Sequence, residues 1–156
     1  MLINNVHCLG LLYISIQIEI KASCYVNSFQ IKILAENDRI DPYSYFKLSE
    51  NSGKKPILID TRWPHEFSIG HLPNAINIPM LKLCCLTSAD VVRELEADIK
   101  EMRDRGVYVI CRRGEDSQIA VLYLRKEFAD SLVPFKDING GYEKWSQAVD
   151  KDFPIY

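Results

Sequence analysis

Short apolar runs alternate with segments of helical periodicity from residue 39 to the end of the chain. Four of the apolar runs have the length of buried strands: residues 56–60, 75–79, 107–110 and 133–138. Strands that are separated by helices indicate βαβ units. The sequence therefore predicts an α/β fold, with a mostly parallel central sheet and helices on both of its faces.

Apolar residues at three- and four-residue steps predict the helices between these strands. Asp41 and Pro42 predict a helix start, since a capping Asp and a first-turn Pro both suit the free N–H groups there. One continuous helix is expected from Ser88, as its N-cap, to Arg105, with Gly106 ending it. Two further helices are expected over residues 117–128 and 142–149.

Residues 1–38 differ from the rest of the chain. Isoleucine alternates there with polar residues, which is the period of a β-strand, at Ile14, Ile16, Ile18 and Ile20. No cluster of chemically reactive side chains is present in this part. We expect residues 1–38 to be an N-terminal appendage or the remnant of a preceding domain, and residues 39–156 to form one folded domain.

The composition excludes two classes of partner. The 156 residues are 47% hydrophobic and 26% charged, with a formal net charge of −2, which is a normal globular balance. No Lys/Arg run is long enough to follow a phosphate backbone, so no nucleic acid is expected as a direct partner. No apolar run approaches the roughly 18–20 residues that span a bilayer, so no membrane is expected either.

The cysteines argue against a disulfide framework and against a zinc site. There are five of them: Cys8, Cys24, Cys84, Cys85 and Cys111. Their number is odd and no two are spaced as C-x-x-C, so we expect neither a disulfide framework nor a zinc site. Free thiols fit a reducing compartment, which predicts a cytoplasmic protein.

Cys111 is placed where parallel sheets carry their sites, directly after the strand at residues 107–110. The next helix begins near Ser117, so its positive end points back at the thiol, and Arg112 and Arg113 add charge nearby. These features predict a lowered pKa and a partly ionised thiol at neutral pH. Gly114 lets the loop turn so that backbone N–H groups face one anion. The alternative is a buried structural cysteine.

Three chemistries use a strand, a cysteine, a loop and a helix in this order. Cysteine phosphatases need C-x5-R, but the sixth residue after Cys111 is Ser117, which disfavours them. Cysteine–histidine hydrolysis has no local support, because no histidine is close in sequence to Cys111; the histidines are His7, His65 and His71. Sulfur transfer needs only one nucleophilic thiolate, which holds the sulfur as a persulfide, and a cradle of N–H groups. It requires no metal and no cofactor, so we expect neither.

Three blocks of the sequence resemble the rhodanese family. Asp60-Thr61-Arg62, followed by EFSIGHLPNAINIP at residues 66–79, is similar to the family's D-x-R and E-F-x-x-G-H-[IL]-P-G-A-x-N-[IV]-P. CRRGED at residues 111–116 is similar to the active loop C-x-x-G-x-x, and NGGYEKW at residues 139–145 to the closing G-G-x-x-x-W. Asn74 stands where the family often has Gly, and Asn tolerates a left-handed conformation.

The loop at residues 108–118 and the ending at residues 152–156 resemble one subgroup, the C-terminal rhodanese domain of the adenylyltransferase-and-sulfurtransferase proteins. Those proteins activate ubiquitin-like sulfur carriers for tRNA thiolation and molybdopterin synthesis. The resemblance implies that Cys111 takes sulfur from a cysteine desulfurase and passes it to the adenylated C-terminus of such a carrier. It also implies a persulfide-binding loop made of Arg112, Arg113, Gly114, Glu115, Asp116 and Ser117.

No adenylyltransferase domain is recognisable, so we expect either a fragment of a longer protein or a stand-alone thiosulfate sulfurtransferase. A non-enzymatic rhodanese-like interaction module is a further alternative, against which the thiol of Cys111 argues. Asp60 and Arg62 are expected to order the loops beside the site through hydrogen bonds and an ion pair. Cys84 and Cys85 are expected to be structural.

Overall fold

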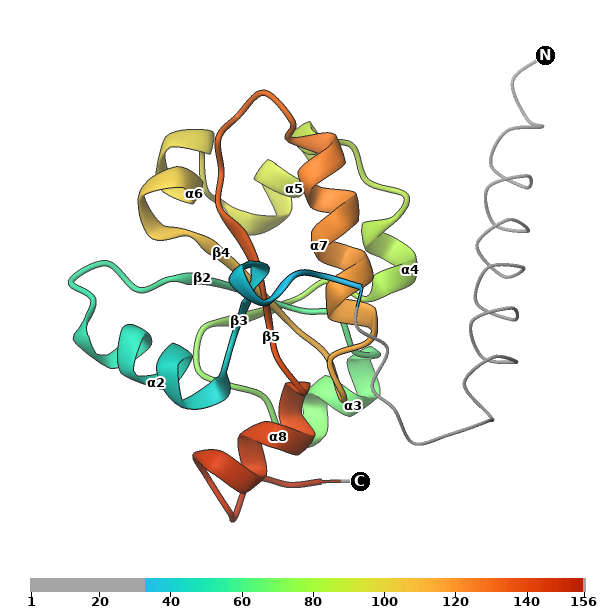
Figure 1. The fold of residues 1–156 in the computed structure, drawn as a ribbon. Coiled ribbons are helices and arrows are strands. Elements are labelled where there is room, and N and C mark those ends of the chain that lie inside the picture. Colours follow the sequence, from blue (N-terminus) through green and yellow to red (C-terminus); the bar gives the residue numbers. More distant parts are fainter. Residues whose placement is uncertain (1–32, 156) are drawn as a thin grey trace. The chain divides into compact units, whose positions relative to one another are not determined.

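The computed structural model describes residues 33–155 (Figure 1). Within this range, five strands form one parallel sheet in the order β1-β5-β4-β2-β3. Their bounds are β1 Arg39–Ile40, β2 Ile57–Asp60, β3 Ala75–Asn77, β4 Val107–Ile110 and β5 Phe135–Ile138. The predicted parallel α/β fold is confirmed, and β1 adds a short edge strand beside β5 that the sequence pattern did not predict.

Helices cover both faces of the sheet, as predicted. They are η1 Glu36–Asp38, α2 Pro42–Asn51, α3 Pro64–Ile69, α4 Met80–Leu83, α5 Ser88–Leu95, α6 Ile99–Arg105, α7 Asp116–Glu127 and α8 Gly141–Ala148. Helices α2 and α8 pack together on one side, and α7 packs on β4 and β5 with α4 beside it (Figure 1). No helix among residues 33–155 is long and apolar enough to cross a membrane.

Alternation along the strands decides which side chains reach each layer. Leu58, Ile110 and Ile138 belong to the core cluster that they form with aromatic side chains of α2 and α8. Successive residues of a strand point to opposite faces. Asp60, two residues after Leu58, therefore points toward α8, and Asp137, one residue before Ile138, points toward α7. The two carboxylates thus lie near the carboxyl ends of their strands, but on opposite faces of the sheet.

The predicted continuous helix over residues 88–105 is wrong, because two helices, α5 and α6, replace it. Glu96 takes a left-handed conformation with a φ of 48°, and the Asp98 side chain then caps α6 by accepting the Glu101 N–H at 2.8 Å. The apolar periodicity hides this break, since Leu95 and Met102 are both buried. Thr87, not Ser88, is the N-cap of α5.

Residues 33–38 pack on the folded domain, although the sequence pattern assigned them to the appendage. The backbone N–H groups of Ile33 and Leu34 both donate to Gln118 Oε1, at 2.9 and 3.1 Å, and Leu34 is buried. The described domain therefore begins before β1. The strand expected around Ile14–Ile20, together with Cys8, Cys24 and His7, lies outside the described residues.

Candidate active site

The Cys111 thiol lies at the carboxyl end of β4, enclosed by the loop that leads into α7. The residue is 3% exposed. The backbone N–H of Gly114 donates to Cys111 Sγ at 3.0 Å, and Ser117 Oγ lies 3.3 Å from the same sulfur. The loop therefore turns back on the cysteine and presents one backbone donor and one hydroxyl to it.

The loop holds this shape because the N-terminus of α8 binds its outer side. Backbone N–H groups in the first turn of α8 donate to the carbonyl oxygens of Cys111 and Arg112, both at 3.0 Å. Gly114 has a φ of 83°, and a Cβ there would lie 2.7 Å from the backbone nitrogen of Gly140. A Cβ on Gly141 would overlap the Cys111 carbonyl oxygen. Both glycines are thus required for the close approach of loop and helix.

Ser117 connects the thiol to a buried acid on the neighbouring strand. Its hydroxyl donates to Asp137 Oδ1 at 2.5 Å, and Arg39 Nε donates to Asp137 Oδ2 at 2.7 Å. Ser117 and Asp137 are both 0% exposed. The sequence pattern predicts Ser117 but not Asp137 or Arg39. The available signal for Asp137 was an acid next to the last residue of a mostly buried strand, residues 135–138.

The predicted lowering of the Cys111 pKa is wrong. Burial, the largest cause, raises the pKa of the Cys111 thiol to about 11, and the negative charges of Asp116 and Asp137 add to the effect. Hydrogen bonds with Ser117 oppose it only in part. The closed loop excludes the water that would solvate a thiolate. In the resting protein at neutral pH, the cysteine therefore carries its proton.

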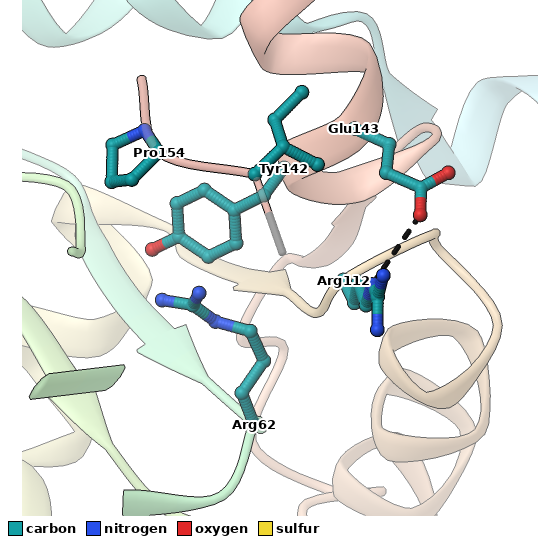
Figure 2. Close-up of a pocket in the computed structure, with 6 residues that line it drawn as sticks. Arg62, Arg112, Tyr142, Glu143 and Pro154 are labelled. Atoms are coloured by element: carbon teal, nitrogen blue, oxygen red, sulfur yellow. Dashed lines mark ion pairs between the residues drawn. The ribbon is translucent and has the colours of Figure 1, made fainter. Parts of the chain in front are cut away.

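Arg112 and Arg113 belong to the loop, and each forms an ion pair with a glutamate. Arg112 Nε lies 3.4 Å from Glu143 Oε1 on α8 (Figure 2), and Arg113 Nη2 lies 3.6 Å from Glu115 Oε2. The side chains of the two arginines are 47% and 59% exposed. Their charges are thus partly balanced at the surface, and they surround the loop's outer side.

Comparison with known proteins identifies the fold family. Residues 45–148 match the Rhodanese family, described as a Rhodanese-like domain. The chain belongs to the rhodanese family. The human single-domain sulfurtransferase TSTD1 shares the fold, with a TM-score of 0.56 over 71% of this chain and 96% of that one, at 21% identity. The predicted family is therefore confirmed.

Several curated relatives match over this rhodanese domain, among them the following two. "Adenylyltransferase and sulfurtransferase MOCS3" of Caenorhabditis briggsae is 36% identical over 126 residues, which cover 81% of this chain and 30% of the relative. "Adenylyltransferase and sulfurtransferase uba4" of Ogataea parapolymorpha is 34% identical over 141 residues, which cover 90% of this chain and 32% of the relative. The chain thus spans about a third of their length, and the resemblance to this subgroup is confirmed over the rhodanese region.

Asp60 and Arg62 form the predicted supporting network of the rhodanese domain. Arg62 Nη2 donates to Asp60 Oδ2 and to the Gly70 carbonyl oxygen, both at 2.7 Å, and the guanidinium lies 3.8 Å from the centre of the Tyr142 ring (Figure 2). The Tyr142 hydroxyl donates to Asp60 Oδ2 at 2.9 Å and accepts the Leu72 N–H at 3.2 Å. This network joins β2, the segment before β3, and α8.

The other predicted residues of the rhodanese domain have structural contacts. His71 stacks on Phe67 with ring centres 3.8 Å apart, and its Nδ1 lies 3.0 Å from the Phe67 carbonyl oxygen. Cys84 is half-buried and Cys85 is exposed after α4, and burial, then the neighbouring Cys85, raises the pKa of Cys84 to about 11. Within residues 33–155, no cluster of three His, Cys, Asp or Glu side chains is placed to hold a metal ion.

Proposed function

We propose that this rhodanese domain is a sulfurtransferase that carries sulfur as a persulfide on Cys111. The observation that supports the proposal best is the enclosure of a thiol at the carboxyl edge of a parallel sheet, with a backbone N–H 3.0 Å from its sulfur. The Cys111 sulfur, as it loses its proton, would attack the outer sulfur of a donor persulfide, forming one S–S bond as another breaks. No metal, cofactor or oxidant takes part in such an exchange.

The proposed donor is a cysteine desulfurase and the proposed acceptor is a ubiquitin-like sulfur carrier, in a cytoplasmic pathway of tRNA thiolation or molybdopterin synthesis. The support is the identity of 36% and 34% with proteins named adenylyltransferase and sulfurtransferase. A protein donor also fits the site, because thiosulfate carries two negative charges toward a thiol that already lies near Asp116 and Asp137.

Two alternatives are less well supported by the same geometry. A cysteine phosphatase would need an arginine where Ser117 stands, and this residue instead donates to the Asp137 carboxylate. A phosphate group would meet that negative charge without a matching guanidinium. A non-enzymatic interaction module would have no use for a buried thiol with a backbone donor and a hydroxyl directed at its sulfur.

Mass spectrometry of the persulfide tests the proposal. The protein is incubated with a cysteine desulfurase and cysteine, and the Cys111 peptide is expected to gain one sulfur, about 32 Da. Cys111→Ser, which is nearly isosteric and keeps the fold, is expected to abolish the adduct and all sulfur transfer. Cys84→Ser and Cys85→Ser are the matched controls and are expected to retain most of the activity. Phosphatase turnover without a sulfur adduct on Cys111 would refute the proposal.

A further inference from the structure

We propose that Ser117 and Asp137 form a proton relay, which takes the thiol proton of Cys111 as this residue attacks its sulfur donor. The inference rests on the proposed function and adds two residues to it. Ser117 would pass the proton, and Asp137 would receive it. Arg39 would position Asp137 through the bond between Arg39 Nε and Asp137 Oδ2.

The direction of the hydrogen bonds fits a relay. The Ser117 hydroxyl donates its own proton to Asp137 Oδ1 at 2.5 Å, so its oxygen lone pairs remain free to accept. Cys111 Sγ, 3.3 Å away, is then the donor to Ser117 Oγ. Each proton in the series thus points from the sulfur toward the carboxylate. All three residues are buried, so bulk water is excluded from this path.

Charge conservation explains why such a relay suits a buried thiol. Loss of the Cys111 proton to water leaves a new charge in a site that excludes solvent, and burial opposes this. Transfer to Asp137 only moves the negative charge from the carboxylate to the sulfur. Arg39 keeps the buried cluster neutral before and after the transfer. Burial also raises the pKa of Asp137, which makes this carboxylate a better proton acceptor.

The step balances with a persulfide donor R–S–SH. The Cys111 S–H proton passes to Ser117 Oγ while the Ser117 hydroxyl proton passes to Asp137. The sulfur electron pair forms a bond to the outer sulfur of the donor, and the donor's S–S bond breaks with its electron pair on R–S⁻. The thiolate R–S⁻ takes a proton from water, and Asp137 later returns its proton to water. The products are Cys111–S–SH and R–SH, and no redox agent is consumed.

A purely electrostatic role of Asp137 and a proton relay predict opposite effects of removing Asp137 on the reactivity of Cys111. The ionisable groups that act on Cys111 are Asp116 on α7 and Asp137 on β5, and both raise its pKa. Arg39 on β1 is paired with Asp137, while Arg112 and Arg113 in the loop are paired with Glu143 and Glu115. If Asp137 acted only through its charge, its removal would make the thiol more reactive. If it accepts the proton, its removal makes the thiol less reactive at neutral pH.

The pH dependence of Cys111 alkylation by iodoacetamide tests the relay. The rate is measured on the Cys111 peptide by mass spectrometry between pH 6.5 and 9.5, in the full chain. The wild type is expected to show a shallow slope near neutrality, because transfer within the cluster needs no loss of a proton to solvent. Ser117→Ala is expected to react about tenfold more slowly at pH 6.5, with a rate that rises nearly tenfold per pH unit. Ser146→Ala is the matched control, because it removes a buried hydroxyl that donates to the Glu143 backbone carbonyl oxygen and not to the relay.

Asp137→Asn provides the second variant, and it is expected to be at least as slow as Ser117→Ala at pH 6.5. Circular dichroism confirms that each variant is folded. If Asp137→Asn does not fold, Ser117→Ala alone still tests the relay, because it leaves the Arg39–Asp137 ion pair intact. Rate profiles of Ser117→Ala parallel to the wild type would overturn the relay, because loss of a hydrogen bond alone scales every rate equally. A faster Asp137→Asn would also overturn it. Alkylation does not depend on sulfur transfer, so failure of the proposed function shows separately, as a missing persulfide.

Discussion

Two buried Asp–Arg pairs lie near the carboxyl ends of the strands, and they differ in the other groups that they contact. Asp60 is the last residue of β2 and accepts the Tyr142 hydroxyl proton, and Arg62, two residues later, donates to Asp60 and to the Gly70 carbonyl oxygen. Asp137 on β5 and Arg39 on β1 bond to each other and, through Ser117, to the Cys111 thiol. In both pairs the carboxylate is completely buried and the arginine nearly so.

Because both pairs are buried, burial alone does not distinguish the pair that is hydrogen-bonded, through Ser117, to the Cys111 thiol. The two carboxylates point to opposite faces of the sheet. Asp60 meets the α8 layer, where it holds loops together, and Asp137 meets the α7 layer, where the thiol lies. A hydrogen-bonded connection to the Cys111 thiol distinguishes the second pair. Variants of each pair test this division between a structural and a chemical pair.

The largest expected effect is on stability, from Asp60→Asn. This change leaves the Arg62 guanidinium buried without its charge partner, which costs about 3–5 kcal/mol. Urea unfolding followed by circular dichroism measures the loss. The alkylation rate of Cys111, per folded molecule, is expected to change less than threefold and to keep its pH slope.

Asp137→Asn is the matched comparison, since it breaks a buried pair of the same kind. Its loss of stability is expected to be similar, but its alkylation profile is expected to become steeper. Equal alkylation profiles in the two variants would remove the distinction between the two pairs.

Gly114→Ala is expected to have the next largest effect, because it disturbs the loop that joins the thiol to the second pair. Alanine at a φ of 83° costs about 1–2 kcal/mol. Its Cβ would also lie 2.7 Å from the Gly140 nitrogen, so the loop must shift away from α8. We expect lower stability and a lower persulfide yield. Gly53→Ala is the control, since a Cβ there meets nothing within 4 Å. A stable Gly114→Ala with full yield would show that the loop tolerates the shift.

Local patterns in the sequence predicted the elements that local forces determine. The strand Val107–Ile110 has the predicted bounds, the Asp41 side chain caps α2 as expected, and Asn74 has the expected left-handed φ, at 61°. Helices α3 and α4 were missed because six and four residues are too few to show a period. The apolar residues also keep a helical spacing across the left-handed turn at Glu96, so the pattern predicted one helix where there are two.

The candidate site was predicted only as far as it is continuous in sequence. Cys111 and its loop follow from one strand and one helix start. The bond between Arg39 and Asp137 joins residues 98 positions apart, so no local pattern contains it. The pKa of Cys111 was predicted in the wrong direction for the same reason. The helix start and the arginines, which would lower the pKa, are visible in the sequence. The burial that raises the pKa more strongly results from the packing of the loop against α8.

Asp116→Thr sharpens the comparison, since Asp116 is a carboxylate near the thiol that belongs to neither pair. Asp116 raises the pKa of Cys111, so its removal is expected to lower that pKa and move the alkylation midpoint to lower pH. Repulsion of the thiosulfate dianion also falls, by about 1–3 kcal/mol per unit charge at an effective dielectric near 20, before salt screening. We expect thiosulfate:cyanide activity to rise about tenfold at low salt and less at high salt. Equal activity in both proteins at low salt would refute this role of Asp116.

Arg112→Ala is expected to have the smallest effect, because Arg112 belongs to an exposed pair. Its Nε lies 3.4 Å from Glu143 Oε1, but the two side chains are 47% and 36% exposed, and solvent screens their attraction. Such pairs contribute about 0.2–1 kcal/mol, against several for a buried pair whose partner is removed. Urea unfolding at low and high salt measures the difference, which is expected to shrink as salt rises. A loss as large as that of Asp60→Asn would mean that Arg112 also holds the loop by contacts other than its charge.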